Sequence, residues 1–166
     1  GNIHEMPADT RPKGLIEQCR NDPDANLKAM RAAASHYQDE LGSQLGDKGH
    51  LDIALFGVGP DGHFASLFPD RPQIYNTDSG TLVLPVTDSP KMPPLRLTLT
   101  AQFIQTASCV WVVATGQRKA EAVGRALREA NNGDVPSSFA QGAERTIWFL
   151  DRKSAVHLQK TAEARL

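Results

Sequence analysis

A short apolar run, Ile53–Phe56, ends in a glycine-rich loop that carries one carboxylate and one imidazole, Asp61 and His63. A run of this length between turn residues is typical of a strand covered on both faces, and loops at the carboxyl ends of such strands bind ligands in α/β proteins. Three glycines lie in the loop: Gly57, Gly59 and Gly62. Glycine allows positive φ and a close approach of the backbone to a small substrate, so His63 is the candidate catalytic acid or base.

The rest of the chain alternates between strand-like and helix-like patterns. The predicted strands are Leu51–Phe56, Thr81–Thr87, Val110–Thr115 and Thr146–Leu150, and the predicted helices are Pro23–Leu45, Thr98–Ala107, Gln117–Ala130 and Arg152–Lys160. Residues 1–23 are predicted to be irregular, and the prolines of Ser89–Pro94 predict a stiff loop. Such alternation indicates a single α/β domain over residues 1–166, with a mostly parallel sheet covered by helices on both faces.

The composition excludes several classes of protein. With 40% hydrophobic and 22% charged residues, the chain has enough apolar side chains to bury a core. A net charge of −1 and the absence of a basic block argue against a nucleic-acid partner, and the longest apolar stretches are too short to span a membrane. Cys19 and Cys109 lie far apart in the sequence, so we expect no disulfide framework, no CxxC metal site and a cytoplasmic location.

A second set of candidate residues follows the strand that ends at Thr115. Arg118 and Lys119 lie in the first helical turn, where a cation is disfavoured by roughly 0.3 to 1 kcal/mol unless a negative group offsets it. Either both side chains point into water or pair with Glu121, or they bind a phosphate at the helix start. Arg96, which follows the proline loop, is a further candidate because a guanidinium group matches phosphate oxygens.

Four segments together resemble one enzyme family, that of 6-phosphogluconolactonases and glucosamine-6-phosphate isomerases. They are residues 57–69, 88–100, 115–120 and 146–151, and the resemblance runs from about Asn2 to Ala155. It implies a Rossmann-like fold of the glucosamine-6-phosphate isomerase type. It also implies hydrolysis of 6-phosphogluconolactone to 6-phosphogluconate, in the oxidative pentose phosphate pathway, with a sugar phosphate as the small-molecule partner and no metal or organic cofactor.

The chain departs from the family pattern at its start. Family members normally begin with a segment that holds a Ser-Gly-Gly phosphate-binding turn and an Asp-Glu-Arg motif, and this chain has neither. We therefore expect a truncated form, the C-terminal portion of a lactonase-like domain, whose missing N-terminal segment is a partner and whose sheet has an exposed edge. Phe64 and Ala101 replace residues that are commonly Thr and Pro in relatives, which removes no chemical group that the reaction needs.

The resemblance also assigns roles to the candidate residues. Lys119 and Arg96 are implied phosphate contacts, and Lys91 and Arg118 are further candidates. A lactone is an activated ester, so the enzyme needs a base for water and donors for the oxyanion. His63 suits the base because an unperturbed imidazole titrates near pH ~6.5, Asp61 either orients it or caps the next turn, and the N–H groups of residues 59–62 serve the oxyanion.

Two other functions stay open. A glucosamine-6-phosphate isomerase or deaminase uses a similar loop but resembles Asn-Glu-Pro after it, where this chain has Ser66–Pro69 without a carboxylate. An inactive sugar-phosphate-binding fragment is the other alternative. The remaining histidines have no ligand-like spacing, so no metal site is expected; Ser66 is interpreted as a helix surface residue, and Trp111 and Trp148 as core residues.

Overall fold

The computed structural model of the protein describes residues 3–7, 9, 11–18 and 20–158. Cys19, Asn2 and the last two positions of the expected C-terminal helix, 159 and 160, lie outside the described residues. The helices are α1 (Lys13–Gln18), α2 (Pro23–Leu45), α3 (Ala101–Thr106) and α4 (Ala120–Arg128), and the strands are β1 (Ile53–Gly57), β2 (Val83–Val86), β3 (Arg96–Leu99), β4 (Cys109–Ala114) and β5 (Arg145–Leu150). Short 3₁₀ turns occupy Gly46–Lys48, Pro72–Tyr75, Gln117–Lys119 and Pro136–Phe139.

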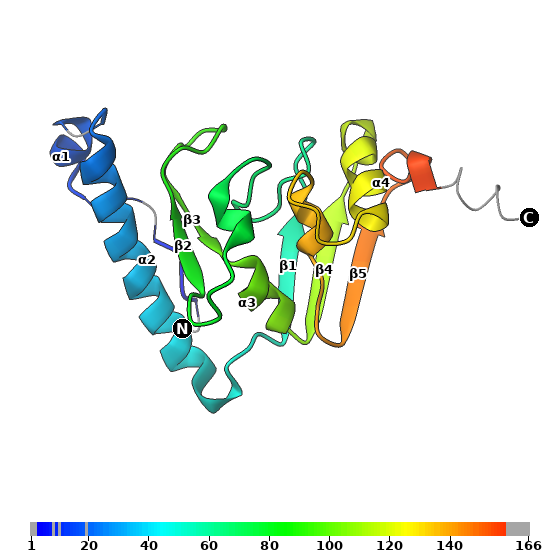
Figure 1. Cartoon of the computed structure of the whole chain (residues 1–166), viewed down its shortest axis with the longest axis horizontal. Helices are drawn as coiled ribbons and strands as arrows, with labels where there is room; N and C mark the ends of the chain where they lie inside the picture. The colour runs from blue at the N-terminus through cyan, green and yellow to red at the C-terminus, as the bar shows by residue number, and fades with distance from the viewer. Residues whose placement is uncertain (1–2, 8, 10, 19, 159–166) are drawn as a thin grey trace, which may run out of the picture.

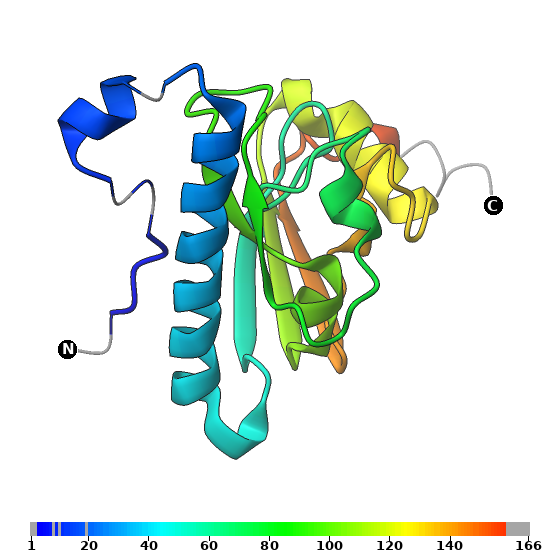
Figure 2. The same cartoon turned by 60° about the vertical axis from the view of Figure 1, so that its left-hand side comes forward.

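The α/β fold is confirmed, with its strands divided between two sheets. Strands β1, β4 and β5 form a parallel sheet in the order β1-β4-β5, whereas β2 and β3 pair with each other in an antiparallel hairpin (Figure 1). Helices α3 and α4 lie on the same side of the parallel sheet (Figure 2). Their residues Ile104 and Val123 pack with Val110 and Val112 of β4 in the main hydrophobic core.

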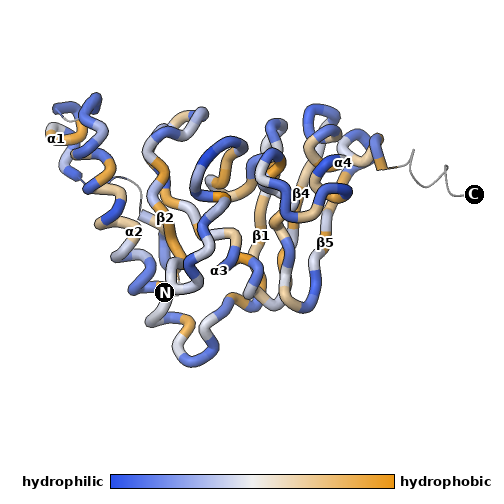
Figure 3. The backbone as a smooth tube through the Cα atoms, viewed as in Figure 1, coloured by the Kyte–Doolittle hydropathy of each residue, from blue (hydrophilic) through white to orange (hydrophobic). Residues whose placement is uncertain are grey.

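The other face of the parallel sheet is uncovered by the described residues, so the expected helices on both faces are present on one face only. Burial alternates along β1: Ala54 is buried, whereas Ile53 and Leu55 are 51% and 63% exposed. Hydrophobic residues nevertheless run along β1 and β2 in Figure 3. The expectation that Ile53–Phe56 is covered on both faces was therefore wrong for this part of the chain, since an apolar run does not reveal which of its faces is packed.

Helix α2 packs on the hairpin and leaves that sheet face open. Its range, Pro23–Leu45, agrees with the prediction. In the structure Asp22 is the N-cap, where its Oδ1 accepts a hydrogen bond from Ala25 N at 2.9 Å, and Pro23 lies in the first turn. A second core cluster joins α2 to the hairpin: Met30, Ala33, Ala34, Tyr37, Val83 and Leu97. Because the apolar side of α2 is used there, it is not available to cover β1.

Several predicted elements differ in detail. The expected helix Thr98–Ala107 begins only at Ala101, because Thr98 and Leu99 pair with β2 and Thr100 caps the helix by accepting from Phe103 N at 3.1 Å. The short helix α1 lies in a stretch predicted to be irregular. Residues 152–155 form turns before the helical residues 156–158.

Two side-chain interpretations also change. Trp148 packs against the main core as expected, but Trp111 lies on the uncovered sheet face, where its ring meets Phe149 edge-on at 5.6 Å between centroids. Ser66 lies in a tight turn, not on a helix, and its N–H donates to Thr98 Oγ1 at 3.2 Å. Within the described part of the chain, no helix is both long and apolar enough to cross a membrane.

Candidate active site

The glycine-rich loop after β1 closes on itself and brings Asp61 and His63 together. Gly59 N–H donates to the His63 carbonyl at 2.7 Å, and Gly62 N–H donates to the Gly59 carbonyl at 3.0 Å. Gly62 has a φ of 86°, as the loop was predicted to require. A Cβ atom on Gly59 would overlap the ring of His63 and the carboxylate of Asp61, so this position requires glycine.

These backbone bonds correct one expectation about the site. The N–H groups of Gly59 and Gly62 were predicted to stabilise an oxyanion, but both already donate to carbonyls within the loop. A donor that is committed in this way is not directed at a developing charge on the substrate. The N–H groups of Gly59 and Gly62 are therefore not available for an oxyanion in this conformation of the loop.

The central pair of the site is His63 and Asp61. His63 Nδ1 lies 2.5 Å from Asp61 Oδ1, and the imidazole side chain is 17% exposed. An ionised carboxylate only accepts hydrogen bonds, so Nδ1 carries the proton and Nε2 keeps the lone pair. This is the tautomer that a general base requires, because the free ring nitrogen accepts the proton of the nucleophile.

Burial and the neighbouring charges shift the pKa of both groups. Burial lowers the pKa of His63 from its ordinary value, the hydrogen bond and charge of Asp61 oppose this, and the positive charges of Lys91 and Lys119 lower it further. For Asp61, burial raises the pKa, but the hydrogen bonds from His63 and Lys91 outweigh it and the pKa is lowered. The site thus favours a neutral imidazole beside an ionised carboxylate.

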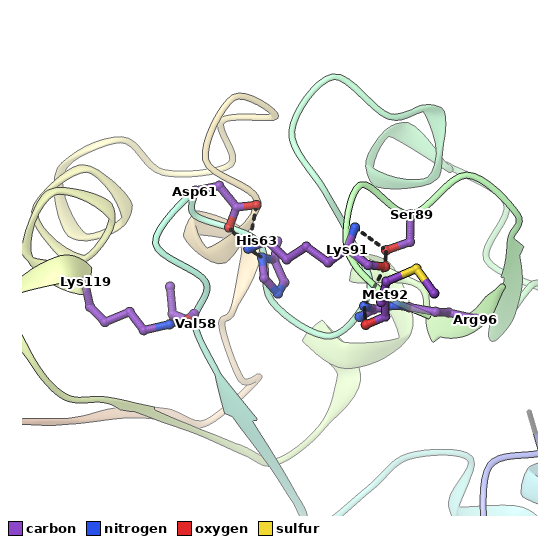
Figure 4. A network of polar contacts seen from close by, with 8 residues as sticks. All are labelled: Val58, Asp61, His63, Ser89, Lys91, Met92, Arg96 and Lys119. Atoms are coloured by element: carbon purple, nitrogen blue, oxygen red, sulfur yellow. Dashed lines mark hydrogen bonds and ion pairs between the residues drawn. The ribbon is translucent and has the colours of Figure 1, made fainter. Parts of the chain in front are cut away.

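Lys91 reaches this pair from the proline loop that precedes β3. Its Nζ lies 3.0 Å from Asp61 Oδ1 and 3.2 Å from His63 Nδ1 (Figure 4). Since Nδ1 donates to Asp61, the contact between the ammonium group and Nδ1 is electrostatic and not a second hydrogen bond. Lys91 was a further candidate for the phosphate, and in this structure its partner is the carboxylate of Asp61.

Lys119 lies on the other side of the cavity, at the junction between β4 and α4. Its Nζ donates to the Val58 carbonyl at 2.5 Å, which brings it to the end of β1 (Figure 4). Burial lowers the pKa of Lys119, and the charge of Lys91 lowers it further. Arg118, its neighbour, is exposed, and Glu121 lies 3.7 Å from His157 Nε2.

Arg96 contacts backbone carbonyls behind the site. Its Nε donates to the Pro93 carbonyl at 2.9 Å, and its Nη2 lies 3.0 and 2.9 Å from the carbonyls of Lys91 and Met92. The guanidinium group also lies 5.5 Å from the centroid of the Phe68 ring, and that ring lies 4.6 Å from the His63 ring. Phe68 was not among the predicted site residues, because nothing in its sequence surroundings distinguishes it from other core aromatics.

The cavity gathers most of the predicted residues. It has a volume of about 440 Å³, and its lining includes Gly57, Gly59, His63, Lys91 and Lys119. Asp61, Gly62, Arg96 and Arg118 are not part of the lining. A larger cavity of about 570 Å³ lies between α2 and the hairpin, and no histidine, cysteine or carboxylate lines it. The chemistry of acid–base catalysis is therefore available in the smaller cavity. Within the described residues, no group of three or more His, Cys, Asp or Glu side chains is placed to hold a metal ion.

Comparison with known sequences decides the family. Residues 1–148 match the family described as glucosamine-6-phosphate isomerases/6-phosphogluconolactonase. The chain belongs to this family. The resemblance drawn from residues 57–69, 88–100 and 115–120 is thereby confirmed.

Curated members of the lactonase–isomerase family are similar over much of the chain. The 6-phosphogluconolactonase of Streptomyces coelicolor is 40% identical over 164 residues, which cover 96% of this chain and 57% of the relative. That of Mycobacterium tuberculosis is 42% identical over 132 residues, covering 78% of this chain and 53% of the relative. The chain thus spans about half the length of the curated relatives it matches.

Solved structures of the family agree on the fold. A 6-phosphogluconolactonase from Thermotoga maritima has a TM-score of 0.62 at 31% identity, covering 72% of this chain and 50% of that one. One from Leishmania guyanensis has a TM-score of 0.64 at 30% identity, covering 80% and 55%. A monomeric glucosamine-6-phosphate deaminase has a TM-score of 0.56 at 25% identity, covering 76% and 54%. The expected fold of the glucosamine-6-phosphate isomerase type is confirmed.

Proposed function

We propose that this chain carries the catalytic base of a 6-phosphogluconolactonase, which hydrolyses 6-phosphogluconolactone to 6-phosphogluconate. One observation carries the proposal: the 2.5 Å contact between His63 Nδ1 and Asp61, in a cavity that two lysines also line. It leaves Nε2 as the proton acceptor of the ring. The names of the similar relatives, 6-phosphogluconolactonases at 40% and 42% identity, support this reaction over others.

The reaction follows from the chemistry of an activated ester. His63 Nε2 takes a proton from water, and the resulting hydroxide forms a bond to the lactone carbonyl carbon. The carbonyl electrons move to oxygen, and the ammonium group of Lys91, beside His63 in the cavity lining, is the positive charge that opposes that oxyanion. When the carbonyl re-forms, the ring C–O bond breaks, and the imidazolium returns its proton to the leaving alkoxide.

The phosphate of the substrate is assigned to Lys119. Its ammonium group lies at the edge of the cavity opposite Lys91. Burial lowers its pKa, and the positive charges of Lys91 and Arg118, which a phosphate would offset, lower it further. Arg118 is the adjacent exposed cation. A phosphate held here fixes the lactone relative to His63, so part of the binding energy becomes orientation of the carbonyl.

Lactonase activity is tested with the full chain and freshly prepared 6-phosphogluconolactone, by the rate of acid release at constant pH. Hydrolysis that disappears in His63→Ala supports the proposal, and hydrolysis that persists excludes His63 as the base.

Calorimetric binding of 6-phosphogluconate without hydrolysis supports the sugar-phosphate-binding alternative. Release of ammonia from glucosamine 6-phosphate supports the deaminase alternative, which the structural similarity to a deaminase keeps in view. The expected place in the pentose phosphate pathway and the cytoplasmic location stay predictions.

A further inference from the structure

The proline loop, residues 89–94, is closed by its own hydrogen bonds. Ser89 N–H donates to the Pro94 carbonyl at 3.1 Å. The Ser89 hydroxyl accepts from Lys91 N–H at 3.2 Å and donates to the Lys91 carbonyl at 2.8 Å. The backbone of Lys91 is therefore held on both its N–H and its carbonyl side.

Arg96 adds three donors to the same loop. Its guanidinium bonds to the carbonyls of Lys91, Met92 and Pro93 occupy Nε and Nη2, at distances of 2.9 to 3.0 Å. The planar fork of arginine directs these donors at fixed angles, which a lysine ammonium group does not reproduce. A guanidinium group that already binds three carbonyls has less capacity left for the oxygens of a substrate phosphate.

Two routes lead from Arg96 to the catalytic imidazole. One passes through the loop to Lys91, whose Nζ lies 3.0 Å from Asp61. The other passes through Phe68, which is 1% exposed and lies between the guanidinium group and the His63 ring. Figure 4 shows Arg96 on the far side of Lys91 from His63, with the loop carbonyls between them.

We infer that Arg96 is a positioning residue and not a ligand of the substrate phosphate: it fixes the proline loop so that Lys91 stays on Asp61 and so controls the protonation of His63. The charged groups that face His63 are Asp61 from its own loop, Lys91 from the proline loop and Lys119 from the start of α4. Of the two routes, only the one through the loop carries charge to the pair, because Arg96 bonds to the Lys91 carbonyl and Lys91 Nζ lies 3.0 Å from Asp61.

The test is an NMR titration of the His63 ring in the full chain, in wild type, Arg96→Lys, Lys91→Met and the double variant. Loss of the Lys91 charge favours the imidazolium, so Lys91→Met raises the pKa of His63. Arg96→Lys keeps the charge but not the fork, and it is expected to raise that pKa in the same direction. In the Lys91→Met background, Arg96→Lys is expected to change nothing further. Arg125→Lys, in a half-buried ion pair with Glu129 at the end of α4, is the matched control and leaves the titration unchanged.

The inference is overturned if Arg96→Lys leaves the His63 titration at its wild-type position, or shifts it equally with and without Lys91. If Arg96→Lys unfolds the chain, Ser89→Ala decides, because it removes the hydroxyl that holds Lys91 and is expected to raise the pKa of His63 likewise. The titration needs no substrate, so it stands apart from the proposed function. The kinetic consequence rests on that function: Arg96→Lys moves the acidic limb of the kcat profile to higher pH with KM nearly unchanged, whereas loss of a phosphate ligand would raise KM.

Discussion

Lys119 donates a 2.5 Å hydrogen bond to the Val58 carbonyl, which joins the first turn before α4 to the carboxyl end of β1. The two residues are 61 positions apart in the chain. The contact holds the ammonium group at the rim of the same cavity that His63 lines. A phosphate arriving at the rim therefore meets a cation whose position is already set.

We expect Lys119→Met to weaken binding of 6-phosphogluconate by about 10- to 100-fold, because a hydrogen bond to a charged group contributes roughly 1.5–3 kcal/mol. Calorimetry with 6-phosphogluconate measures this directly. Gluconate, which has no phosphate, serves as the control ligand, and its weak binding is expected to be the same in both proteins. Equal affinity of wild type and variant for 6-phosphogluconate would remove Lys119 from the phosphate site.

His63→Ala is expected to lower lactone turnover by about 10² to 10⁴-fold, the usual contribution of a general base. The affinity for 6-phosphogluconate should change by no more than a few-fold, since the phosphate contact lies elsewhere in the cavity. Initial rates with the lactone and calorimetry with the product check the two parts separately. A parallel loss of both would point to collapse of the loop instead.

Asp61→Asn and Lys91→Met are expected to move the acidic limb of the kcat/KM profile in opposite directions. His63 acts as a base when neutral, and burial places its pKa below the ordinary value, so the wild-type limb lies below pH ~6.5. Removing the Asp61 carboxylate lowers that pKa further, and removing the Lys91 ammonium group raises it. The measurement is kcat/KM across pH 4.5 to 8, and movement of both variants in one direction would contradict the arrangement described.

Gly59→Ala is expected to abolish most activity, because the added methyl group overlaps the His63 ring and the Asp61 carboxylate. Gly57→Ala is the matched control two positions earlier. There the nearest atom to a new Cβ is the Val113 carbonyl oxygen at 3.9 Å, an ordinary contact. Activity and thermal melting of both variants test this; a fully active Gly59→Ala would mean that the loop moves freely.

Adjacent valines of β4 are expected to differ in their contribution to stability. Val112 is fully buried in the main core, whereas Val113 is 42% exposed on the uncovered face. Val112→Ala should lower the free energy of unfolding by about 1–3 kcal/mol, and Val113→Ala by about 0.5 kcal/mol or less. Urea unfolding of the two variants gives both values. Equal losses would show that the second face of the sheet is packed in solution.

Elements whose sequence signals lie within their own segment were predicted correctly, and helix α2 is the example. The helix Pro23–Leu45 was predicted from its helical periodicity, a pattern that lies within the segment itself, and its bounds agree with the structure. The run Arg96–Leu99 carries no such signal, and it forms a strand because β2, which precedes it in the chain, pairs with it. A hairpin partner is a tertiary contact, so helix periodicity alone was misleading there.

The candidate site shows the same division between local and distant contacts. Asp61 and His63 are two residues apart in one loop, and contact between them is one of the two roles that were predicted for Asp61. The cations were predicted as phosphate contacts and not as partners of this pair. The acceptor that each cation contacts depends on the folded structure. Lys91 contacts the Asp61 carboxylate, Lys119 contacts the Val58 carbonyl just after β1, and Arg96 contacts carbonyls of the neighbouring proline loop. Residue type and spacing identify the charge but not its partner.

The strand that delivers His63 to the cavity also presents Ile53 and Leu55 to water on its open face. Bare hydrocarbon of this kind adsorbs detergents and fluorescent hydrophobic dyes. A molecule that binds this face of β1 contacts the strand whose carboxyl end leads into the His63 loop. The fluorescence of a dye bound there would therefore report on β1, the strand that leads into the candidate active site.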